Sequence, residues 1–341
     1  MNFKKILLIG GSGFIGRKVA DLLYQRGTRV LIPARHRDHV KRVTISPTAF
    51  VVEADVHDPA VLRGLMCGMD AVINLVGVLH DNDSRPPYGK RFSAAHVELP
   101  EKIVAAMQAE GVRRLIHLSA LKAAADSPAA YLRSKAAGEA VVLNAANSLD
   151  VTIFRPSVIF GPEDKFLNVF ASMLKHLPIL PLIGANARLQ PVSVDDVAQT
   201  ILASLNNAAS FGRVYELAGP RVYTLRELID SLNELLGTQR PIVELPPSIA
   251  SLLARLLAYL PSPPVSPDNL RMLQVGSVSD GSANYPGWQP GSLEASLSSW
   301  PSITATPRAS PNQPLTPLIS TVFSKQQRLD AFRSRAGRLA G

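Results

Sequence analysis

Three glycines at intervals of three residues, Gly10, Gly13 and Gly16, stand where they could hold a phosphate. They follow an apolar run over residues 6–9 and precede a helical pattern over residues 14–24. A glycine-rich turn between a strand and a helix lets backbone N–H groups and the helix N-terminus approach a pyrophosphate. The alternative is a turn of this composition that binds nothing, because the spacing is not the commoner G-x-G-x-x-G. We predict a dinucleotide cradle formed by Gly10, Ser12, Gly13, Phe14, Ile15 and Gly16.

The residues that follow the next expected strands would face the same cofactor. Arg35 lies 19 residues past Gly16, where a fold that prefers NAD carries an acidic residue for the ribose 2′-hydroxyl. A guanidinium can pair with a 2′-phosphate, so Arg35 favours NADP over NAD as the cofactor. The alternative is that Arg35 belongs to a basic surface loop. The further cofactor residues that we expect are Asp55 and Val56 at the adenine, and Leu75 and Gly77 near the ribose and phosphates.

Ser119, Tyr131 and Lys135 form a candidate proton-transfer group. Ser119 follows a strand expected over residues 114–118, and Tyr131 and Lys135, four residues apart, share one face of the next expected helix. A phenol with the ordinary pKa near 10 is a poor base at neutral pH. A nearby ammonium favours the phenolate, which would let Tyr131 exchange protons while Ser119 orients a substrate oxygen. The alternative is an ordinary helix surface, because a Tyr-x-x-x-Lys pair is common by chance.

These residues need a scaffold that brings strand ends together. Apolar runs alternate with amphipathic helical patterns, which predicts an α/β fold with a doubly wound parallel sheet of the Rossmann type. We expect a Rossmann domain over 1–160 to which 190–218 return, a smaller α+β substrate or lid domain over 161–300, and a disordered, basic Pro/Ser-rich tail over 301–341. The expected strands cover 6–9, 30–32, 50–52, 71–75, 114–118 and 151–154, and the expected helices cover 14–24, 59–66, 92–110 and 131–146.

Composition limits the partners. The net charge of the 341 residues is +9, but the tail holds six Lys or Arg against one Asp, so nucleic acid is not an expected partner. The lone Cys67 excludes an internal disulfide framework, and we expect it in the core at a helix end. The apolar run of four residues after Lys5 is too short for a signal peptide. We expect a cytoplasmic protein.

Taken together, these motifs resemble the short-chain dehydrogenase/reductase superfamily, in its extended or atypical epimerase/dehydratase branch. Further similar segments cover 154–162, 192–198 and 215–228. The pattern is most similar to the NADPH-binding accessory subunit of respiratory complex I and its bacterial counterparts. The resemblance implies hydride transfer to or from a carbonyl or hydroxyl substrate, a link to quinones or the respiratory chain, and a nicotinamide end lined by Pro156 and Val158.

Two functions from different classes remain open. Only 11 residues separate Ser119 from Tyr131, whereas sugar-nucleotide epimerases of this branch carry a longer loop, so a nucleotide-sugar substrate is disfavoured. One function is an NADP(H)-dependent oxidoreductase that uses Ser119, Tyr131 and Lys135. The other is a protein that holds NADPH in a structural or assembly role, since the complex I branch has often lost such residues.

The sequence predicts an apolar helix over residues 249–260, which could contact a membrane or a substrate. It is either packed into the small domain or lies at a membrane surface or against a lipid-like quinone. The expected partners are therefore a small-molecule, lipid-like substrate and peripheral contact with the inner membrane or a respiratory complex. No His spacing suggests a metal site, and we predict no metal. The sequence leaves the oligomeric state open.

Overall fold

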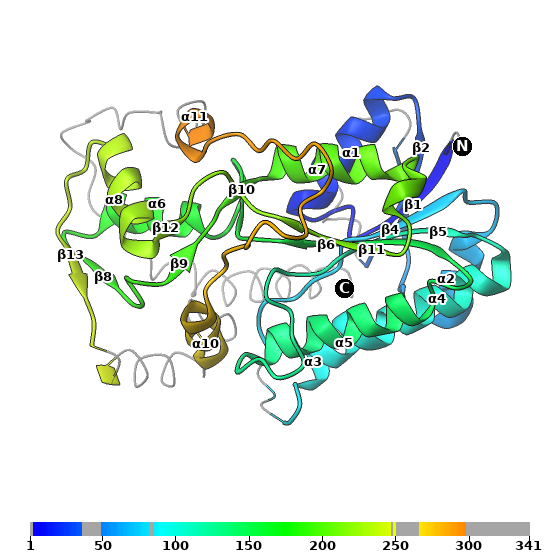
Figure 1. Ribbon diagram of the computed structural model, residues 1–341, viewed down its shortest axis with the longest axis horizontal. Helices are drawn as coiled ribbons and strands as arrows, with labels where there is room; N and C mark the ends of the chain where they lie inside the picture. Colours follow the sequence, from blue (N-terminus) through cyan, green and yellow to red (C-terminus); the bar gives the residue numbers. More distant parts are fainter. Residues whose placement is uncertain are drawn as a thin grey trace, which may run out of the picture. The chain divides into compact units, whose positions relative to one another are not determined.

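A seven-stranded parallel sheet forms the centre of the fold (Figure 1). The computed structural model describes residues 3–35, 49–81, 83, 85–246, 248–249 and 266–297. The strand order is β11-β6-β5-β4-β1-β2-β3, so the chain winds outward in both directions from β1, and the predicted doubly wound sheet is confirmed. The strands are β1 Lys5–Ile9, β2 Arg29–Ala34, β3 Ala49–Glu53, β4 Ala71–Asn74, β5 Arg114–Leu118, β6 Asp150–Pro156 and β11 Arg213–Leu217.

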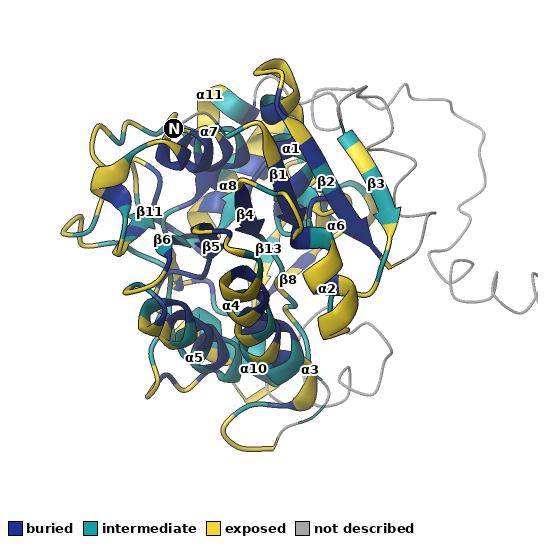
Figure 2. Cartoon of the chain, turned by 90° about the vertical axis from the view of Figure 1, so that its right-hand side faces the viewer, coloured by how far each residue is buried: buried dark blue, intermediate teal, exposed yellow. Residues whose placement is uncertain are grey.

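Helices cover both faces of this sheet (Figure 1). Alternate side chains of β1 enter opposite cores: Ile6 and Leu8 pack with α1 and α7, whereas Leu7 and Ile9 pack with α2, α4 and α5. The central strands are therefore buried on both faces, and the edge strand β3 is partly exposed (Figure 2). The helices are α1 Phe14–Gln25, α2 Pro59–Met66, α3 Lys90–Ser93, α4 Leu99–Glu110, α5 Ala130–Asn144 and α7 Val194–Leu205.

A second, smaller core follows β6, as the sequence predicts for the α+β part of the fold. Short strands and helices surround a separate apolar cluster that includes Leu174, Leu182, Leu228 and Ile229. A capping box formed by Thr224 and Glu227 begins one of these helices. The elements of this part are β7 Ile159–Phe160, α6 Leu167–His176, β8 Leu180–Leu182, β9 Arg188–Leu189, β10 Val192–Ser193, β12 Tyr223–Thr224, α8 Leu225–Leu235, β13 Ile242–Glu244, α10 Pro267–Val275 and α11 Leu293–Leu297.

The helix expected over 92–110 is interrupted. A π-helical turn, Ala94–Glu98, separates α3 from α4. Pro100 has no N–H to donate to the His96 carbonyl four residues earlier, which removes one α-helical hydrogen bond at this point. The same carbonyl lies against Gly138 of α5, where a Cβ would collide with it. The interruption thus brings the backbone at His96 close to α5.

The expectation for Cys67 is wrong, and two other expected segments lie outside the described residues. Cys67 is exposed rather than in the core, because Leu62 and Met66 already form the buried face of α2 and Cys67 follows its last turn. The predicted apolar helix beyond Ile249 and the predicted tail over 301–341 lie outside the described residues.

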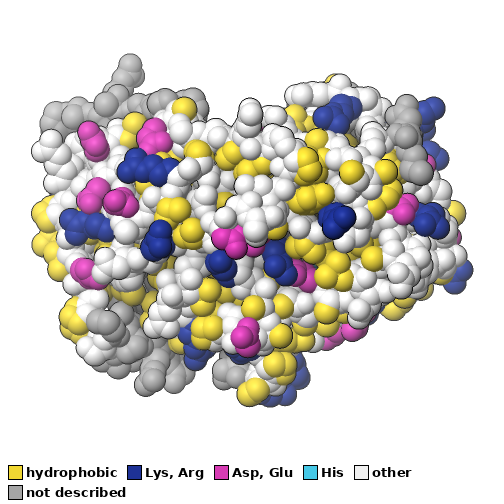
Figure 3. Space-filling view, in the orientation of Figure 1, with side chains coloured by type: hydrophobic (Ala, Val, Ile, Leu, Met, Phe, Trp, Pro, Cys, Tyr) yellow, Lys and Arg dark blue, Asp and Glu magenta, His cyan; other side chains and the backbone are white. Residues whose placement is uncertain are grey.

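The surface carries both signs of charge. On the face drawn in Figure 3, Lys and Arg side chains are interspersed with Asp and Glu. Within the ranges that the structure describes, no helix has the length and apolarity needed to cross a membrane.

Candidate dinucleotide and proton-transfer site

The glycine turn after β1 is tightly constrained by its own backbone. Gly10 has a left-handed φ of +84°, and the Gly13 N–H donates to the Gly10 carbonyl at 3.0 Å. A Cβ on Gly16 would collide with that carbonyl and lie 2.5 Å from Gly11 Cα. Gly13, in contrast, is exposed with an ordinary φ of −77°. The fold therefore explains Gly10 and Gly16, whereas it constrains Gly13 less, since a Cβ there would lie 3.2 Å from the Gly10 carbonyl oxygen.

The start of α1 has the properties of an anion site. No side chain caps this helix N-terminus, and its first turn contains no acidic residue. The first N–H groups of a helix lack partners inside the helix, and the macrodipole adds partial positive charge there. The half-exposed Ser12 and the exposed Gly13 lie directly before the helix. The residues present thus fit a pyrophosphate, which is the group that the sequence predicts here.

Neighbouring segments hold this turn in place. The Arg17 guanidinium donates to the Ser12 carbonyl at 3.0 Å and also forms an ion pair with Glu163. The half-buried Phe14 ring lies so close to Gly161 that a Cβ there would be 2.8 Å from Phe14 Cζ. Ile15, also half-buried, packs against the core beneath α1 and α7. The side chains of Phe14 and Ile15 thus have packing roles, and their predicted cofactor contacts would come from the backbone.

The other predicted cofactor residues follow neighbouring strands at one edge of the sheet. Gly10 lies against Leu75, since a Cβ on Gly10 would be 3.1 Å from the Leu75 carbonyl carbon. The exposed Arg35 follows β2, and the exposed Asp55 follows β3 and accepts the His57 N–H at 3.0 Å. Gly77 is exposed with open space around it. The half-buried Val56 completes this set, whose contacts with a cofactor stay a prediction.

Ser119, Tyr131 and Lys135 converge at the carboxyl end of β5. Lys135, which is 3% exposed, donates from Nζ to the Leu118 carbonyl at 2.6 Å. Tyr131 packs against an apolar cluster that contains Ala120. Ser119 stands between Leu118 and Ala120 in the chain, and its buried hydroxyl has no hydrogen-bond partner among the described residues. The structure therefore places Lys135 and Tyr131 against the residues on either side of Ser119, and the joint role of the three stays a prediction.

The pKa values in this group differ from the sequence-based expectation. Burial raises the pKa of the Tyr131 phenol to about 12, and no effect of Lys135 offsets it. Burial lowers the pKa of the Lys135 ammonium to about 8, against an opposing effect of Glu139. The expectation that Lys135 favours the Tyr131 phenolate is therefore wrong for the protein without ligands. Near pH 7 the phenol holds its proton.

Two buried histidines beside this group have no signal in the sequence pattern. His96 accepts the Val78 N–H at Nε2 (3.0 Å), so its proton lies on Nδ1, which bonds to Ser134 Oγ at 2.8 Å. The His96 ring meets the Tyr131 ring edge to face, with centroids 5.5 Å apart. His117 bonds through Nδ1 to the Asn74 amide at 3.2 Å. Burial first and the Lys135 charge second lower the pKa of His96 to about 2 and of His117 to about 3, so both are neutral.

Pro156 and Val158 lie between the sheet and the smaller core. The carbonyl of Pro156, at the end of β6, accepts the Leu121 N–H at 2.9 Å, which places it beside the loop that begins with Ser119. Val158 is half-buried against the smaller core. Their predicted role at the nicotinamide end is compatible with this position and stays a prediction. Within the described part of the chain, no three His, Cys, Asp or Glu side chains cluster as metal ligands would.

Comparisons with known proteins agree with this arrangement. Residues 6–218 match the NAD dependent epimerase/dehydratase family. The mitochondrial NADH dehydrogenase (ubiquinone) 1 alpha subcomplex subunit 9 of Arabidopsis thaliana is 32% identical over 282 residues, which cover 80% of this chain and 68% of that protein. A ceramide reductase of Caulobacter vibrioides is 28% identical over 243 residues, which cover 71% of this chain and 73% of that enzyme.

A solved structure shares the fold. The Bordetella bronchiseptica enzyme WbmH in complex with NAD+ has a TM-score of 0.63 and 20% sequence identity, with 87% of this chain and 97% of that one covered. At this identity the likeness concerns the fold alone. From the family match and the Arabidopsis relative, the chain belongs to the NAD dependent epimerase/dehydratase family.

Proposed function

We propose that this protein is an NADP(H)-dependent oxidoreductase of the short-chain dehydrogenase/reductase type that acts on a carbonyl or hydroxyl group. The buried, unpartnered Ser119 hydroxyl carries the proposal. A buried polar group without a partner costs about 1–3 kcal/mol, which a substrate oxygen at this place would offset. Lys135 contacts the Leu118 carbonyl and Tyr131 packs against the cluster that contains Ala120, so the groups needed for proton exchange would lie near that oxygen.

The cofactor would lie along the sheet edge that leads to Ser119. Bound NADPH supplies the hydride. The glycine turn and the start of α1 would hold its pyrophosphate, and Arg35 would pair with the 2′-phosphate. Asp55 and Val56 would hold the adenine. Leu75 and Gly77 would line the ribose, and Pro156 and Val158 the nicotinamide.

The protonation states favour reduction of a carbonyl. Near pH 7 Tyr131 carries its proton, so its hydroxyl can donate to a substrate oxygen that gains negative charge. Ser119 would donate a hydrogen bond to the same oxygen and fix its position. Lys135, with its pKa lowered to about 8, would keep a positive charge near the phenolate that forms. The Caulobacter relative, named a ceramide reductase, supports a lipid-like substrate. Residues 161–300 would form the domain that covers this substrate.

A second candidate is a non-catalytic NADPH-binding subunit or assembly factor. It is favoured by the Arabidopsis relative, whose name is that of a complex I subunit. In that case the protein would contact a respiratory complex at the inner membrane, whereas the enzyme would be cytoplasmic. Turnover of any quinone, aldehyde, ketone or sterol-like alcohol with NADPH supports the enzyme. Stoichiometric bound NADPH without turnover on that panel supports the subunit.

Cofactor binding itself is tested at Gly13. A Cβ on Gly13 would lie 3.2 Å from the Gly10 carbonyl oxygen, so Gly13→Val requires a small shift of the turn, and its folding is checked by circular dichroism. The branched side chain would stand where the pyrophosphate must approach. We expect calorimetry to show at least a tenfold loss of NADPH affinity. Gly64→Val on the open surface of α2 is the matched control and should bind like the wild type. Unchanged affinity in Gly13→Val would show that the cradle is assigned wrongly.

A further inference from the structure

The helix that carries Tyr131 and Lys135 lacks a local cap. Its N-cap position is Ala129, whose side chain cannot accept a hydrogen bond, and its first turn holds no acidic residue. The nearest hydroxyl, Ser127 Oγ, accepts the Ala129 N–H at 3.3 Å. The N–H groups of the first helical turn therefore need an acceptor from elsewhere in the chain.

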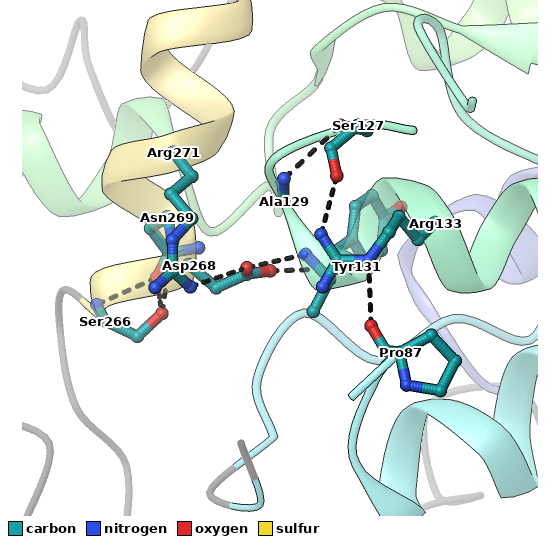
Figure 4. A network of polar contacts seen from close by, with 10 residues as sticks. Pro87, Ser127, Ala129, Tyr131, Arg133, Ser266, Asp268, Asn269 and Arg271 are labelled. Atoms are coloured by element: carbon teal, nitrogen blue, oxygen red, sulfur yellow. Dashed lines mark hydrogen bonds and ion pairs between the residues drawn. The ribbon is translucent and has the colours of Figure 1, made fainter. Parts of the chain in front are cut away.

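Asp268, the second residue of α10, supplies that acceptor (Figure 4). Its Oδ1 accepts the Ala130 N–H at 2.7 Å and its Oδ2 accepts the Tyr131 N–H at 3.0 Å. Both carboxylate oxygens are thus bonded to successive amides, one of which belongs to Tyr131 itself. A carboxylate at a helix N-terminus also gains from the macrodipole.

Asp268 is itself held in place. A capping box joins Ser266 and Asn269 around it, and Arg271 lies 3.5 Å from its Oδ1. Its side chain is only 15% exposed. Two further residues of α10, Met272 and Val275, pack against the same apolar cluster as Tyr131. Helix α10 therefore contacts the start of α5 through hydrogen bonds at its first turn and through apolar side chains in its later turns.

We propose that Asp268 is a positioning residue: from α10 it fixes the backbone at Tyr131 and so determines where the phenol lies. The proton-transfer role of Tyr131 belongs to the proposed function, on which this inference rests. The consequence is specific. The first turn of α5 has its hydrogen-bond acceptor only while α10 packs against it. The segment over 266–275 therefore controls the position of Tyr131 without contributing a group to the reaction.

The test removes the carboxylate and follows Tyr131 without any cofactor or substrate. In Asp268→Ala, hydrogen exchange read by mass spectrometry should be about tenfold faster over residues 130–133. The pKa of Tyr131 should fall from about 12 toward 10 as the phenol becomes less buried. This pKa is measured as the difference in tyrosinate absorbance between Asp268→Ala and the double variant that also carries Tyr131→Phe. Asp268→Asn keeps one acceptor oxygen and the shape of the side chain, so this variant should fold. It should show smaller changes in the exchange rate and in the Tyr131 pKa.

Two controls separate positioning from simple stabilisation. Asp126→Ala removes an exposed charge from the loop before α5 and should change neither measurement. Asp268→Ala should also lower the melting temperature, because the first turn of α5 loses its acceptor. Ala129→Ser offers a local acceptor at that end, so in the Asp268→Ala background it should restore the melting temperature but not the Tyr131 pKa, which depends on the packing of α10 against α5. Recovery of both would reduce Asp268 to an ordinary cap and overturn the positioning role, as would wild-type exchange and pKa in Asp268→Ala. Because no cofactor is present, these outcomes are independent of the NADPH result at Gly13.

Discussion

The carbonyl oxygen of Gly10 fills the space into which a side chain on Gly16 would project. The obstacle is backbone of the same turn, so it cannot move aside as a flexible side chain would. The close approach of α1 to the end of β1, on which the helix N-terminus depends for its position, therefore requires glycine at position 16.

Gly16→Ala should therefore damage both the fold and the cradle. We expect a loss of about 1–3 kcal/mol in the free energy of unfolding, typical of overpacking, together with loss of NADPH binding. Urea unfolding and calorimetry measure the two effects. Gly64→Ala is the matched control, since it lies in an exposed helix with open space and should stabilise by about 0.5–1 kcal/mol. A Gly16→Ala variant as stable as the wild type would contradict this packing.

Arg35→Ala should change which cofactor is preferred. A charge-assisted pair contributes on the order of 1.5–3 kcal/mol, so NADPH affinity should fall about 10–150-fold while NADH affinity stays nearly the same. Fluorescence titration with each cofactor measures the ratio. Arg29→Ala, at the opposite end of β2, removes the same charge and should leave both affinities as they are. Equal losses for NADPH and NADH in Arg35→Ala would point to a general surface effect.

Tyr131→Phe should remove proton transfer and leave the ring packing intact. The ring keeps its contacts with His96 and Phe92, so cofactor affinity should not change. We expect kcat for carbonyl reduction to fall by about 10²–10⁴, the usual contribution of a general acid. Tyr24→Phe, on the exposed side of α1, is the control. A Tyr131→Phe variant that fully complements a deletion strain would favour the non-catalytic subunit instead.

The buried histidines should make the protein sensitive to acid. In the unfolded chain a histidine titrates near 6.5, whereas His117 titrates at about 3 and His96 at about 2 in the fold. The unfolded state therefore binds more protons between these values, and stability present above pH 6.5 is lost as the pH falls. Each histidine should remove about 1.4 kcal/mol per pH unit from the free energy of unfolding.

The contribution of one histidine is measured by replacing it. Between pH 6 and pH 4 the free energy of unfolding, measured with urea, should fall by about 2–3 kcal/mol less in His117→Gln than in the wild type. His176→Gln, in which an exposed histidine is replaced, is the matched control and should follow the wild type. An identical pH dependence in His117→Gln and wild type would mean that His117 is not held neutral by the fold.

Patterns along the sequence were enough to predict the parallel sheet, its helices and the glycine turn after β1. Helix α2 begins and ends at the predicted Pro59 and Met66, and the predicted strand over 114–118 is β5. Hydrophobic period, glycine turns and capping boxes act within a few residues of one another, so they can be predicted without knowledge of distant contacts. The group of Ser119, Tyr131 and Lys135 was predicted in the same way, because helix spacing and strand ends are local features of the sequence.

The protonation states and the backbone contacts of that group, in contrast, depend on tertiary contacts. Burial, which depends on the whole fold, keeps the proton on Tyr131 and overturns the expectation drawn from its spacing to Lys135. The acceptor for the start of α5 is Asp268, 137 residues beyond Tyr131 in the chain, and no periodicity connects the two. Exposed Cys67 has the same explanation, since the direction of one side chain depends on which neighbours already fill the core. Desolvation and long-range hydrogen bonds arise between segments that only the folded chain brings together, so a pattern along the sequence cannot carry them.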